Sequence, residues 1–250
     1  MNIGNGQFWR GDCLELMRQI PDASVDMILC DLPYGTTQNK WDSLIPFEPL
    51  WAHYWRVAKP NAAIVLTAAQ PFTSALVMSQ VEYFKYEWIW HKSRATGHLN
   101  AKKMPMREHE SICVFGKGSI YYEPQMYNKT KGFRKAQKSV KSSGSYGDVK
   151  EGIFREVNEE LAYPKSVQKF NDCFHDREAG LHPTQKPVDL FAYLIRTYTQ
   201  PGQIVLDNCA GSGTTAIAAE RERRKWLCIE QDETYYNAAC GRVWKEVLKL

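Results

Sequence analysis

The sequence lacks a long apolar run: none of its 250 residues belongs to a stretch that approaches the length of a membrane span. Residues 1–6 also lack the basic and then apolar pattern of a signal peptide, and we find no internal repeat. We therefore expect a cytosolic protein without a membrane partner. The length suits one large α/β domain, or such a domain with an inserted lobe.

Close cysteine pairs are missing as well. The seven cysteines form no C-x-x-C pair and several lie inside apolar runs, which favours a reducing compartment and argues against a disulfide framework. Cys173, His175 and His182 lie near one another along the chain, but their spacing matches no zinc pattern. We expect no metal site.

Acidic residues are scarce in one segment. Residues 92–150 contain 13 Lys and Arg but 4 Asp and Glu, a net charge of +9, whereas residues 1–91 carry −3 and residues 151–250 carry −2. A basic run alone is more typical of a solvated loop. This one is interleaved with aromatic residues, a mixture that suits the phosphates and bases of nucleic acid. They are Tyr121, Tyr122, Tyr127, Phe133 and Tyr146.

Outside the middle of the chain, apolar runs alternate with helical spacing. Strands are predicted over residues 25–30, 62–67, 86–90, 111–115, 204–207 and 226–230, and helices over 47–58, 71–79, 187–198 and 214–222. This alternation predicts an α/β fold with a doubly wound, mostly parallel, Rossmann-like sheet. The pattern weakens over 119–180. We interpret that stretch as an inserted lobe between residues 1–118 and 181–250, with part of the Lys92–Arg107 loop beside it.

A glycine-containing turn joins the strand at 204–207 to the following helix. Gly211 and Gly213 would let the backbone approach a ligand closely, at the start of that helix. Glu230 ends the next strand, 23 residues after Asp207, where a carboxylate can hold two ribose hydroxyls. We interpret these features as a nucleoside cofactor site. Ala216 takes the third glycine position of the dinucleotide fingerprint, which is therefore incomplete. Since alanine is sometimes accepted at that position, the loop alone also allows a nicotinamide enzyme, and it allows a plain turn.

The tetrapeptide Asp31-Leu32-Pro33-Tyr34 follows the first predicted strand. An amino group on a nucleobase is a poor nucleophile, because its lone pair is delocalised into the ring. The Asp31 carboxylate and the Leu32 carbonyl could accept hydrogen bonds from the two N–H groups of this amine, and so hold its lone pair out of conjugation with the ring. Pro33 stiffens the turn, and Tyr34 offers a flat face for a base rotated out of the duplex. Taken alone, the tetrapeptide is equally typical of an acidic strand end followed by a proline turn.

Together these motifs resemble the permuted β class of DNA amino-methyltransferases, and most closely the N6-adenine-specific members. In that class a D-P-P-Y-type tetrapeptide comes first, a target-recognition region follows, and an F-x-G-x-G-type cofactor loop comes near the C-terminus. Here the order is Asp31–Tyr34, the basic lobe, and Asp207–Thr215. The resemblance covers nearly the whole chain except the lobe. It implies methyl transfer from S-adenosylmethionine to a flipped base of double-stranded DNA.

The resemblance also implies roles for individual residues. Asp12, with Cys13 beside it, would contact the adenine amino group of the cofactor, and Thr184, Gln185 and Lys186 of an H-P-T-x-K-P segment would pack around its methionine end. The remaining cofactor contacts would come from Asp31, Asp207, Ala210, Gly211, Ser212, Gly213, Thr214 and Glu230. For DNA binding we select Lys92, Arg94, Lys102, Lys103, Arg107, Lys129, Lys131, Arg134, Lys135 and Lys138.

Two positions depart from the family pattern. Leu32 replaces the usual first proline, and Asn208-Cys209-Ala210 lacks the aromatic residue that often precedes the first glycine. A tetrapeptide that starts with Asp favours adenine N6 as the target in this family, with cytosine N4 as the alternative. A catalytically silent DNA-binding relative and an unrelated oxidoreductase are the other classes considered. The family includes homodimers, but no sequence feature establishes one here.

Overall fold

The computed structural model describes residues 1–35, 43–129, 160–172 and 185–250. The chain divides into two compact units, one formed by Met1–Glu123 with Ser166–Leu250 and the other by Pro124–Lys165. These boundaries differ from the 119–180 expected for the lobe. The difference arises because strand β9, Val167–Phe170, pairs with β5, Phe84–Thr96, and so belongs to the main sheet.

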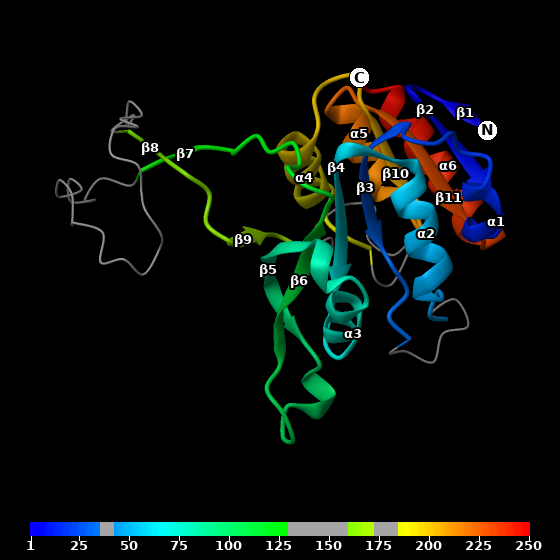
Figure 1. The fold of residues 1–250 in the computed structure, drawn as a ribbon. Helices are drawn as coiled ribbons and strands as arrows, with labels where there is room; N and C mark the ends of the chain where they lie inside the picture. Colours follow the sequence, from blue (N-terminus) through cyan, green and yellow to red (C-terminus); the bar gives the residue numbers. More distant parts are fainter. Residues whose placement is uncertain (36–42, 130–159, 173–184) are drawn as a thin grey trace. The chain divides into compact units, whose positions relative to one another are not determined.

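A nine-stranded sheet forms the centre of the first unit (Figure 1). Five neighbouring strands run parallel, and β6 is antiparallel to both of its neighbours. The spatial order is β1 (Asn2–Ile3), β2 (Gly6–Arg10), β11 (Lys225–Glu230), β10 (Ile204–Asp207), β3 (Val25–Asp31), β4 (Ala58–Ala68), β6 (Arg107–Phe115), β5 and β9. The mostly parallel, Rossmann-like fold that the sequence predicts is confirmed.

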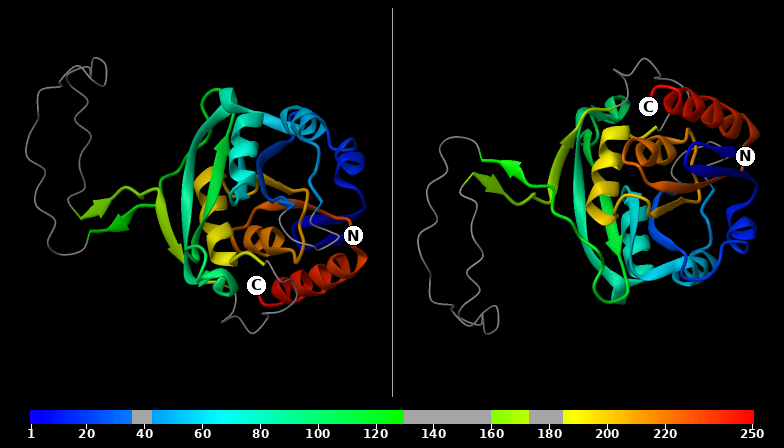
Figure 2. Two further views of the ribbon diagram at one scale, coloured as in Figure 1. Left: turned by 90° about the horizontal axis from the view of Figure 1, so that it is seen from below. Right: turned by 90° about the horizontal axis from the view of Figure 1, so that it is seen from above.

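Helices cover both faces of this sheet, as Figures 1 and 2 show. Alternate residues of β3 enter two separate cores, Met27 and Leu29 on one face and Ile28 and Cys30 on the other, as the period of two in a strand requires. The first core includes α4 (Val188–Tyr198), α5 (Thr214–Arg221) and α6 (Glu233–Val247), and the second includes α1 (Cys13–Met17), α2 (Phe47–Val57) and α3 (Phe72–Ser79).

A topological switch point lies between β3 and β10. From β3 the chain continues through α2 to β4 on one side, and from β10 it continues through α5 to β11 on the other side. In open α/β sheets, ligands bind beyond the carboxyl ends of the strands at such a point. Asp31, Asp207 and Glu230 are the last residues of β3, β10 and β11. The fold therefore brings both predicted motifs to one edge of the sheet.

Strands β5 and β6 extend well beyond their predicted ranges and form a hairpin. The predicted Lys92–Arg107 loop is therefore shorter, since Thr96 still pairs with Arg107 and the tip spans residues 97–106. The tip contains a short 3-10 helix, His98–Asn100, and another, Val81–Tyr83, precedes β5. The extension was missed because the outer part of the hairpin is largely exposed, so its strands carry no apolar alternation.

The second unit contains a short antiparallel pair in its described part. Strand β7, Tyr127–Asn128, pairs with β8, Leu161–Ala162, and the Lys129 amide donates to the Glu160 carbonyl at 2.8 Å. Across the described residues of both units, no helix combines the length and the apolar character needed to cross a membrane.

Candidate active site

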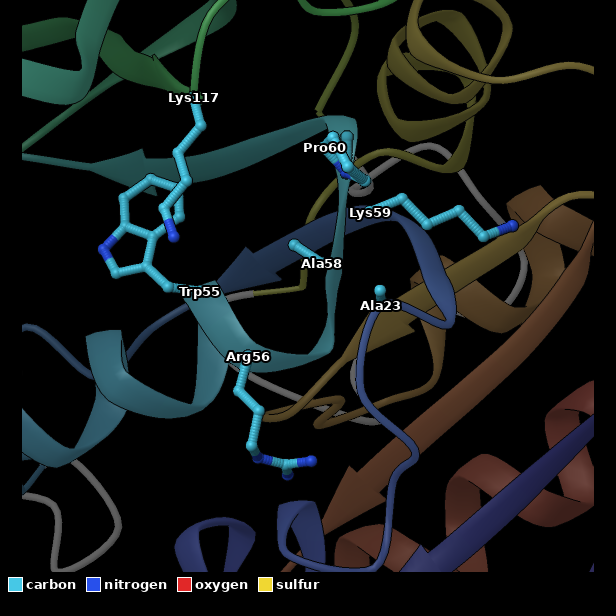
Figure 3. A pocket seen from close by; sticks show the side chains of 8 residues that line it. Ala23, Trp55, Arg56, Ala58, Lys59, Pro60 and Lys117 are labelled. Atoms are coloured by element: carbon cyan, nitrogen blue, oxygen red, sulfur yellow. The ribbon is translucent and has the colours of Figure 1, made fainter.

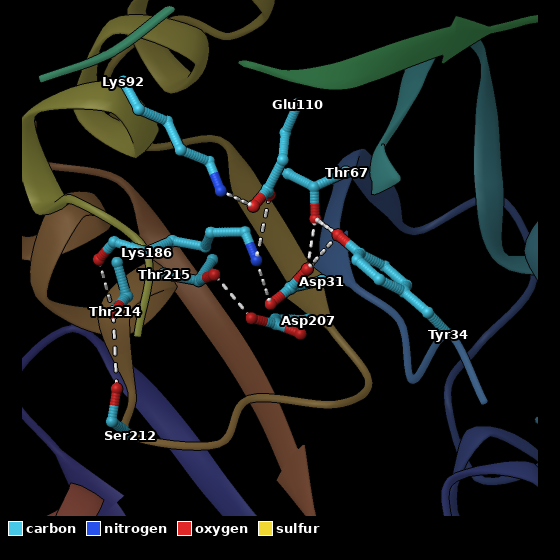
Figure 4. Close-up of polar contacts among 10 residues, drawn as sticks. All are labelled: Asp31, Tyr34, Thr67, Lys92, Glu110, Lys186, Asp207, Ser212, Thr214 and Thr215. Carbon is cyan, nitrogen blue, oxygen red and sulfur yellow. Dashed lines mark hydrogen bonds and ion pairs between the residues drawn. The ribbon is translucent and has the colours of Figure 1, made fainter. Parts of the chain in front are cut away.

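The Asp31 carboxylate is the centre of a compact polar cluster (Figure 4). Its Oδ1 accepts hydrogen bonds from the Tyr34 hydroxyl, at 2.7 Å, and from the Thr67 hydroxyl. Thr67 lies beside Asp31 because β3 and β4 pair in register at these two residues. The Asp31 side chain is 23% exposed, so the carboxylate is held in the structure but still reachable from the sheet edge.

Lys186 bridges Asp31 to a second carboxylate. Its Nζ lies 2.6 Å from Asp31 Oδ2 and 3.4 Å from Glu110 Oε2, and the side chain is 6% exposed. Glu110 also forms an ion pair with Lys92. Carboxylates and ammonium groups thus alternate in the order Asp31, Lys186, Glu110 and Lys92 (Figure 4). The sequence predicted that Lys186 would pack around a cofactor, whereas the structure directs its charged end toward Asp31.

This alternation keeps the cluster ionised despite its burial. Burial raises the pKa of Glu110, but the ammonium groups of Lys186 and Lys92 outweigh it and leave that pKa below its ordinary value. Burial likewise lowers the pKa of Lys186, yet Asp31 and Glu110 raise it above its ordinary value. Lys186 therefore remains a cation at any physiological pH, and it serves Asp31 as a fixed charge rather than as a proton carrier.

Tyr34 contributes its hydroxyl as well as its ring. The ring stacks on Phe72 of α3, with centroids 5.2 Å apart and planes inclined by 23°, and Lys186 Nζ lies 5.6 Å from its centroid. Burial, followed by the charges of Asp31 and Glu110, raises the Tyr34 pKa well above its ordinary value, so the hydroxyl stays a hydrogen-bond donor. With Phe72 against one face, at most one face of the ring is open to a flipped base. Leu32 is buried in the core beside this turn.

The loop after β10 is held closely to the neighbouring segments. Gly213 has a φ of +77°, and a Cβ there would lie 3.2 Å from Ala239, so the turn into α5 requires glycine. Thr214 donates from its hydroxyl to the Lys186 carbonyl at 3.3 Å, and Ser212 Oγ lies 3.5 Å from Thr214 Oγ1 (Figure 4). This loop, which includes the buried Ala210, thus touches the segment that carries Lys186.

Glu230 joins this loop to the end of β11. Its two carboxylate oxygens accept from the amides of Gly211, at 2.7 Å, and Asp232, at 2.8 Å. Burial raises the pKa of Glu230 above its ordinary value. The Gly11 amide donates to the Glu230 carbonyl at 3.0 Å, so Asp12, the next residue, lies near the end of β11. Asp12 caps α1 by accepting from the Glu15 amide at 3.0 Å.

Asp207 is buried beneath the loop and supports it. Its carboxylate accepts from the Cys209 amide at 3.0 Å and from the Thr215 hydroxyl. Burial raises the Asp207 pKa to about 6, against the hydrogen bonds that favour its charged form. Asp207 is 3% exposed and supports the turn, and the cofactor contact that the sequence predicts for it stays a prediction. The thiol of Cys13 is buried in the core on the α1 side.

The predicted DNA contacts fall into three groups. Arg94, Lys102, Lys103 and Arg107 lie on the exposed part of the β5–β6 hairpin, and Lys129 follows β7 in the second unit. Lys92 is 11% exposed and paired with Glu110, so we leave it out of the proposed DNA surface. The third group, Lys131, Arg134, Lys135 and Lys138, lies outside the described residues. The predicted cofactor contact Thr184 lies outside them as well, as do Cys173, His175 and His182.

A pocket of about 340 Å³ lies at the opposite end of β4 (Figure 3). Trp55 and Lys117 line it together with Arg56 and Lys59, and Lys117 Nζ lies 5.2 Å from the Trp55 ring centroid. Arg56 donates to backbone carbonyls and to Asp22, and Lys59 pairs with Asp26. Because these two cations are already satisfied and the pocket is far from the strand ends that carry Asp31, we assign it no role in the site.

Three residues of the cluster escaped sequence analysis. Thr67 ends the predicted strand at 62–67, and its position beside Asp31 follows only from the pairing of β3 with β4. Phe72 lies in the predicted helix at 71–79, and its contact with the Tyr34 ring depends on how that helix packs. Glu110 reaches the site because β6 runs antiparallel to β4, with Ser111 opposite Ala68. The one signal available in the sequence was that Thr67 ends the predicted strand that follows the one before Asp31, so that the two side chains could meet at the same sheet edge.

Known proteins of one family share this chain's sequence pattern and fold. A family model for N6/N4 methyltransferases, described as DNA methylase, matches residues 25–240. Type II methyltransferase M1.MboII of Moraxella bovis is 26% identical over 247 residues, covering 91% of this chain and 92% of the relative. The solved M1.HpyAVI–SAM complex matches with a TM-score of 0.63 at 22% identity, over 95% of this chain and 99% of its own.

A second solved structure, the cytosine-N4-specific PvuII DNA methyltransferase, matches with a TM-score of 0.67 at 16% identity, covering 99% of this chain and 94% of its own. At such identities the structural likeness shows the fold. The family match spans most of the chain, and the chain therefore belongs to the N6/N4 DNA methylases. It is a DNA amino-methyltransferase, as its motifs led us to expect.

Proposed function

We propose that this protein transfers a methyl group from S-adenosylmethionine to the exocyclic N6 of a flipped adenine in a specific duplex DNA sequence. The observation that carries the proposal is the position of the Asp31 carboxylate. It ends β3 at the switch point, beside the loop after β10, and Lys186, Tyr34 and Thr67 hold it in place.

The cluster leaves Asp31 able to receive the substrate amine. A carboxylate offers about four acceptor positions. Two hydroxyls occupy Oδ1 and Lys186 occupies one position on Oδ2, so one position on Oδ2 remains for an N–H of the base. With the Leu32 carbonyl as the second acceptor, this geometry would hold the nitrogen lone pair out of the ring. Positioning and polarisation of the amine supply the acceleration. The proton that the nitrogen loses passes to water.

The residues beside Asp31 suit the proposed cofactor, which would supply an electrophilic methyl group on a positively charged sulfur. Glu230 can exchange its amide donors for ribose hydroxyls, and Asp12 Oδ2 can accept from an adenine amino group. Gly211 and Gly213 bring backbone close to this space. M1.HpyAVI, whose fold this chain shares, is named as a SAM complex.

Adenine is preferred over cytosine because the tetrapeptide begins with Asp. Cytosine N4 stays the second candidate, since the PvuII enzyme of the same fold is cytosine-N4-specific. Both amines pose the same hydrogen-bonding problem, so the network around Asp31 serves either.

A direct test combines purified protein with duplex DNA of diverse sequence and methyl-labelled S-adenosylmethionine. We expect label in DNA, recovered as N6-methyladenine after digestion to nucleosides. Recovery as N4-methylcytosine would overturn the choice of base, and unlabelled DNA would overturn the activity. Methylation-aware sequencing of host DNA after expression then gives the recognition sequence.

A further inference from the structure

The tip of the β5–β6 hairpin, residues 97–106, exposes three apolar side chains among cations. Leu99 is 88% exposed, Met104 53% and Met106 42%. Single exposed apolar residues are ordinary on a protein surface, but three within eight residues of one tip indicate a contact surface. Long apolar side chains on a narrow projection suit insertion into a partner rather than packing against a flat one.

The tip is ordered by its own backbone. Gly97 has a φ of +90° and starts the turn. The amides of Lys103 and Met104 both donate to the Asn100 carbonyl, at 2.8 and 3.0 Å. These bonds fix the turn without help from the rest of the domain. An element that inserts into a partner benefits from an ordered turn, because a flexible loop would lose more conformational entropy on binding.

The charge around these side chains selects a polyanion. From residue 92 to residue 107 the sequence contains five Lys and Arg and no Asp or Glu. Lys102, Lys103 and Arg107 are exposed beside the three apolar side chains. Cations that lie beside an apolar projection suit a nucleic-acid backbone next to an opened base step.

The hairpin also starts at the catalytic edge of the sheet. Ser111 of β6 pairs with Ala68, the last residue of β4, one position beyond the Asp31–Thr67 pair. Residues 97–110 therefore continue past the strand ends, on the side of the sheet where β3 ends (Figure 1). Duplex DNA that delivers a base to Asp31 would meet the tip next to the position which that base has left.

We propose that Leu99, Met104 and Met106 enter the DNA base stack beside the flipped nucleotide and stabilise the gap. This inference rests on the proposed function, since it takes duplex DNA as the substrate. Removing a base from the stack costs free energy that a wedge of apolar side chains can offset. The cations of the tip hold the backbone, and the apolar side chains replace the lost stacking.

The test compares two duplexes that carry the mapped recognition sequence, one fully paired and one with the target base opposite a mismatch. A variant with Leu99→Ala, Met104→Ala and Met106→Ala should lose about tenfold or more in single-turnover rate on the paired duplex. On the mismatched duplex, where the base is already loosened, the loss should be about threefold or less. Leu248→Ala, which changes another exposed leucine directly after α6, is the matched control and should leave both rates unchanged.

A second variant separates the wedge from the charge. Lys102→Gln with Lys103→Gln should weaken binding of both duplexes alike and flatten its salt dependence, whereas the apolar variant should keep the wild-type salt slope. Equal losses on paired and mismatched DNA for the apolar variant would overturn the wedge. If that variant methylates paired DNA normally but loses binding to phosphatidylserine vesicles, the tip contacts lipid and the inference is wrong. Absence of label with wild-type protein would instead remove the proposed function itself.

Discussion

Replacing Lys186 with methionine should destabilise the protein and slow methyl transfer. The change removes an ammonium that is 6% exposed and lies between Asp31 and Glu110, while it keeps an apolar stem of similar length. Removing one partner of a buried ion pair costs roughly 3–5 kcal/mol. Here Glu110 keeps Lys92, and Asp31 keeps two hydroxyl donors, so we expect a loss of about 2–3 kcal/mol.

The loss should depend on pH in a defined direction. Against the effect of burial, Lys186 and Lys92 hold the pKa of Glu110 below its ordinary value of 4.5. A carboxyl with a lowered folded-state pKa contributes stability above its unfolded pKa, and this stability disappears as the pH falls through the folded value. Without Lys186 part of that contribution is absent. The difference between Lys186→Met and wild type should therefore be largest at pH 6–8 and shrink below about pH 4.5.

Lys92→Met is the matched control, because it removes a cation from Glu110 without touching Asp31. Urea unfolding followed by fluorescence measures stability, and single-turnover methylation measures the rate. We expect both variants to lose stability, but only Lys186→Met to lose about tenfold or more in rate, since a loosened Asp31 no longer orients the amine. Comparable rates for the two variants would show that Lys186 has a structural role alone.

A double-mutant cycle with Glu110→Gln completes the test. If the four charges act as one network, the destabilisation of Lys186→Met and Glu110→Gln should fail to add, with a coupling of about 1 kcal/mol or more. Additive losses within about 0.5 kcal/mol would refute the network as described, because independent sites behave in that way.

Three further changes test other parts of the structure. Asp31→Asn keeps the shape of the side chain but removes its charge, so transfer should fall by about a thousandfold or more while DNA affinity stays close to wild type; near-normal turnover would contradict the catalytic role. Asp207 has its pKa raised from 3.8 to about 6 by burial, so it makes folding less favourable as the pH rises through this window. Asp207→Asn should therefore flatten the pH dependence of stability by about 2 kcal/mol between pH 4 and 6, and unfolding curves unchanged from wild type at both ends would count against this. Neutral substitutions in the basic lobe should weaken DNA binding and reduce the slope of log affinity against log salt, and an unchanged slope would relocate the DNA surface; the residues are Lys129, Lys131, Arg134, Lys135 and Lys138.

Local pattern was sufficient for the parallel core and insufficient for the antiparallel flank. Strand β10 matches its predicted range, because a buried parallel strand is a continuous apolar run. Strands β5 and β6 were predicted too short, since their outer residues are polar and exposed. Strand β9 was placed in the lobe because its partner β5 lies about 80 residues earlier in the sequence.

The candidate site divides in the same way. Asp31 and Glu230 stand at strand ends that the sequence marks clearly, and Tyr34 lies in the turn after Asp31. The role of Glu110 depends on the direction of β6, and the direction of the Lys186 side chain depends on two carboxylates from distant strands. Long-range pairing of this kind leaves no local trace in one sequence, so the charge network became visible only in the fold.

The second unit is inserted between Glu123 and Ser166 of the first unit, and this arrangement affects how such a protein can evolve. Glu123 and Ser166, which flank the insertion, are fastened within the first unit, because the Glu123 amide donates to the Thr197 carbonyl and the Ser166 carbonyl accepts from the Ile89 amide. A segment anchored at both ends in this manner can be exchanged for another of different length and sequence without disturbing Asp31 or its supports. We therefore propose that an exchange of this unit could alter the DNA sequence that is recognised, while Asp31 and its supports are kept.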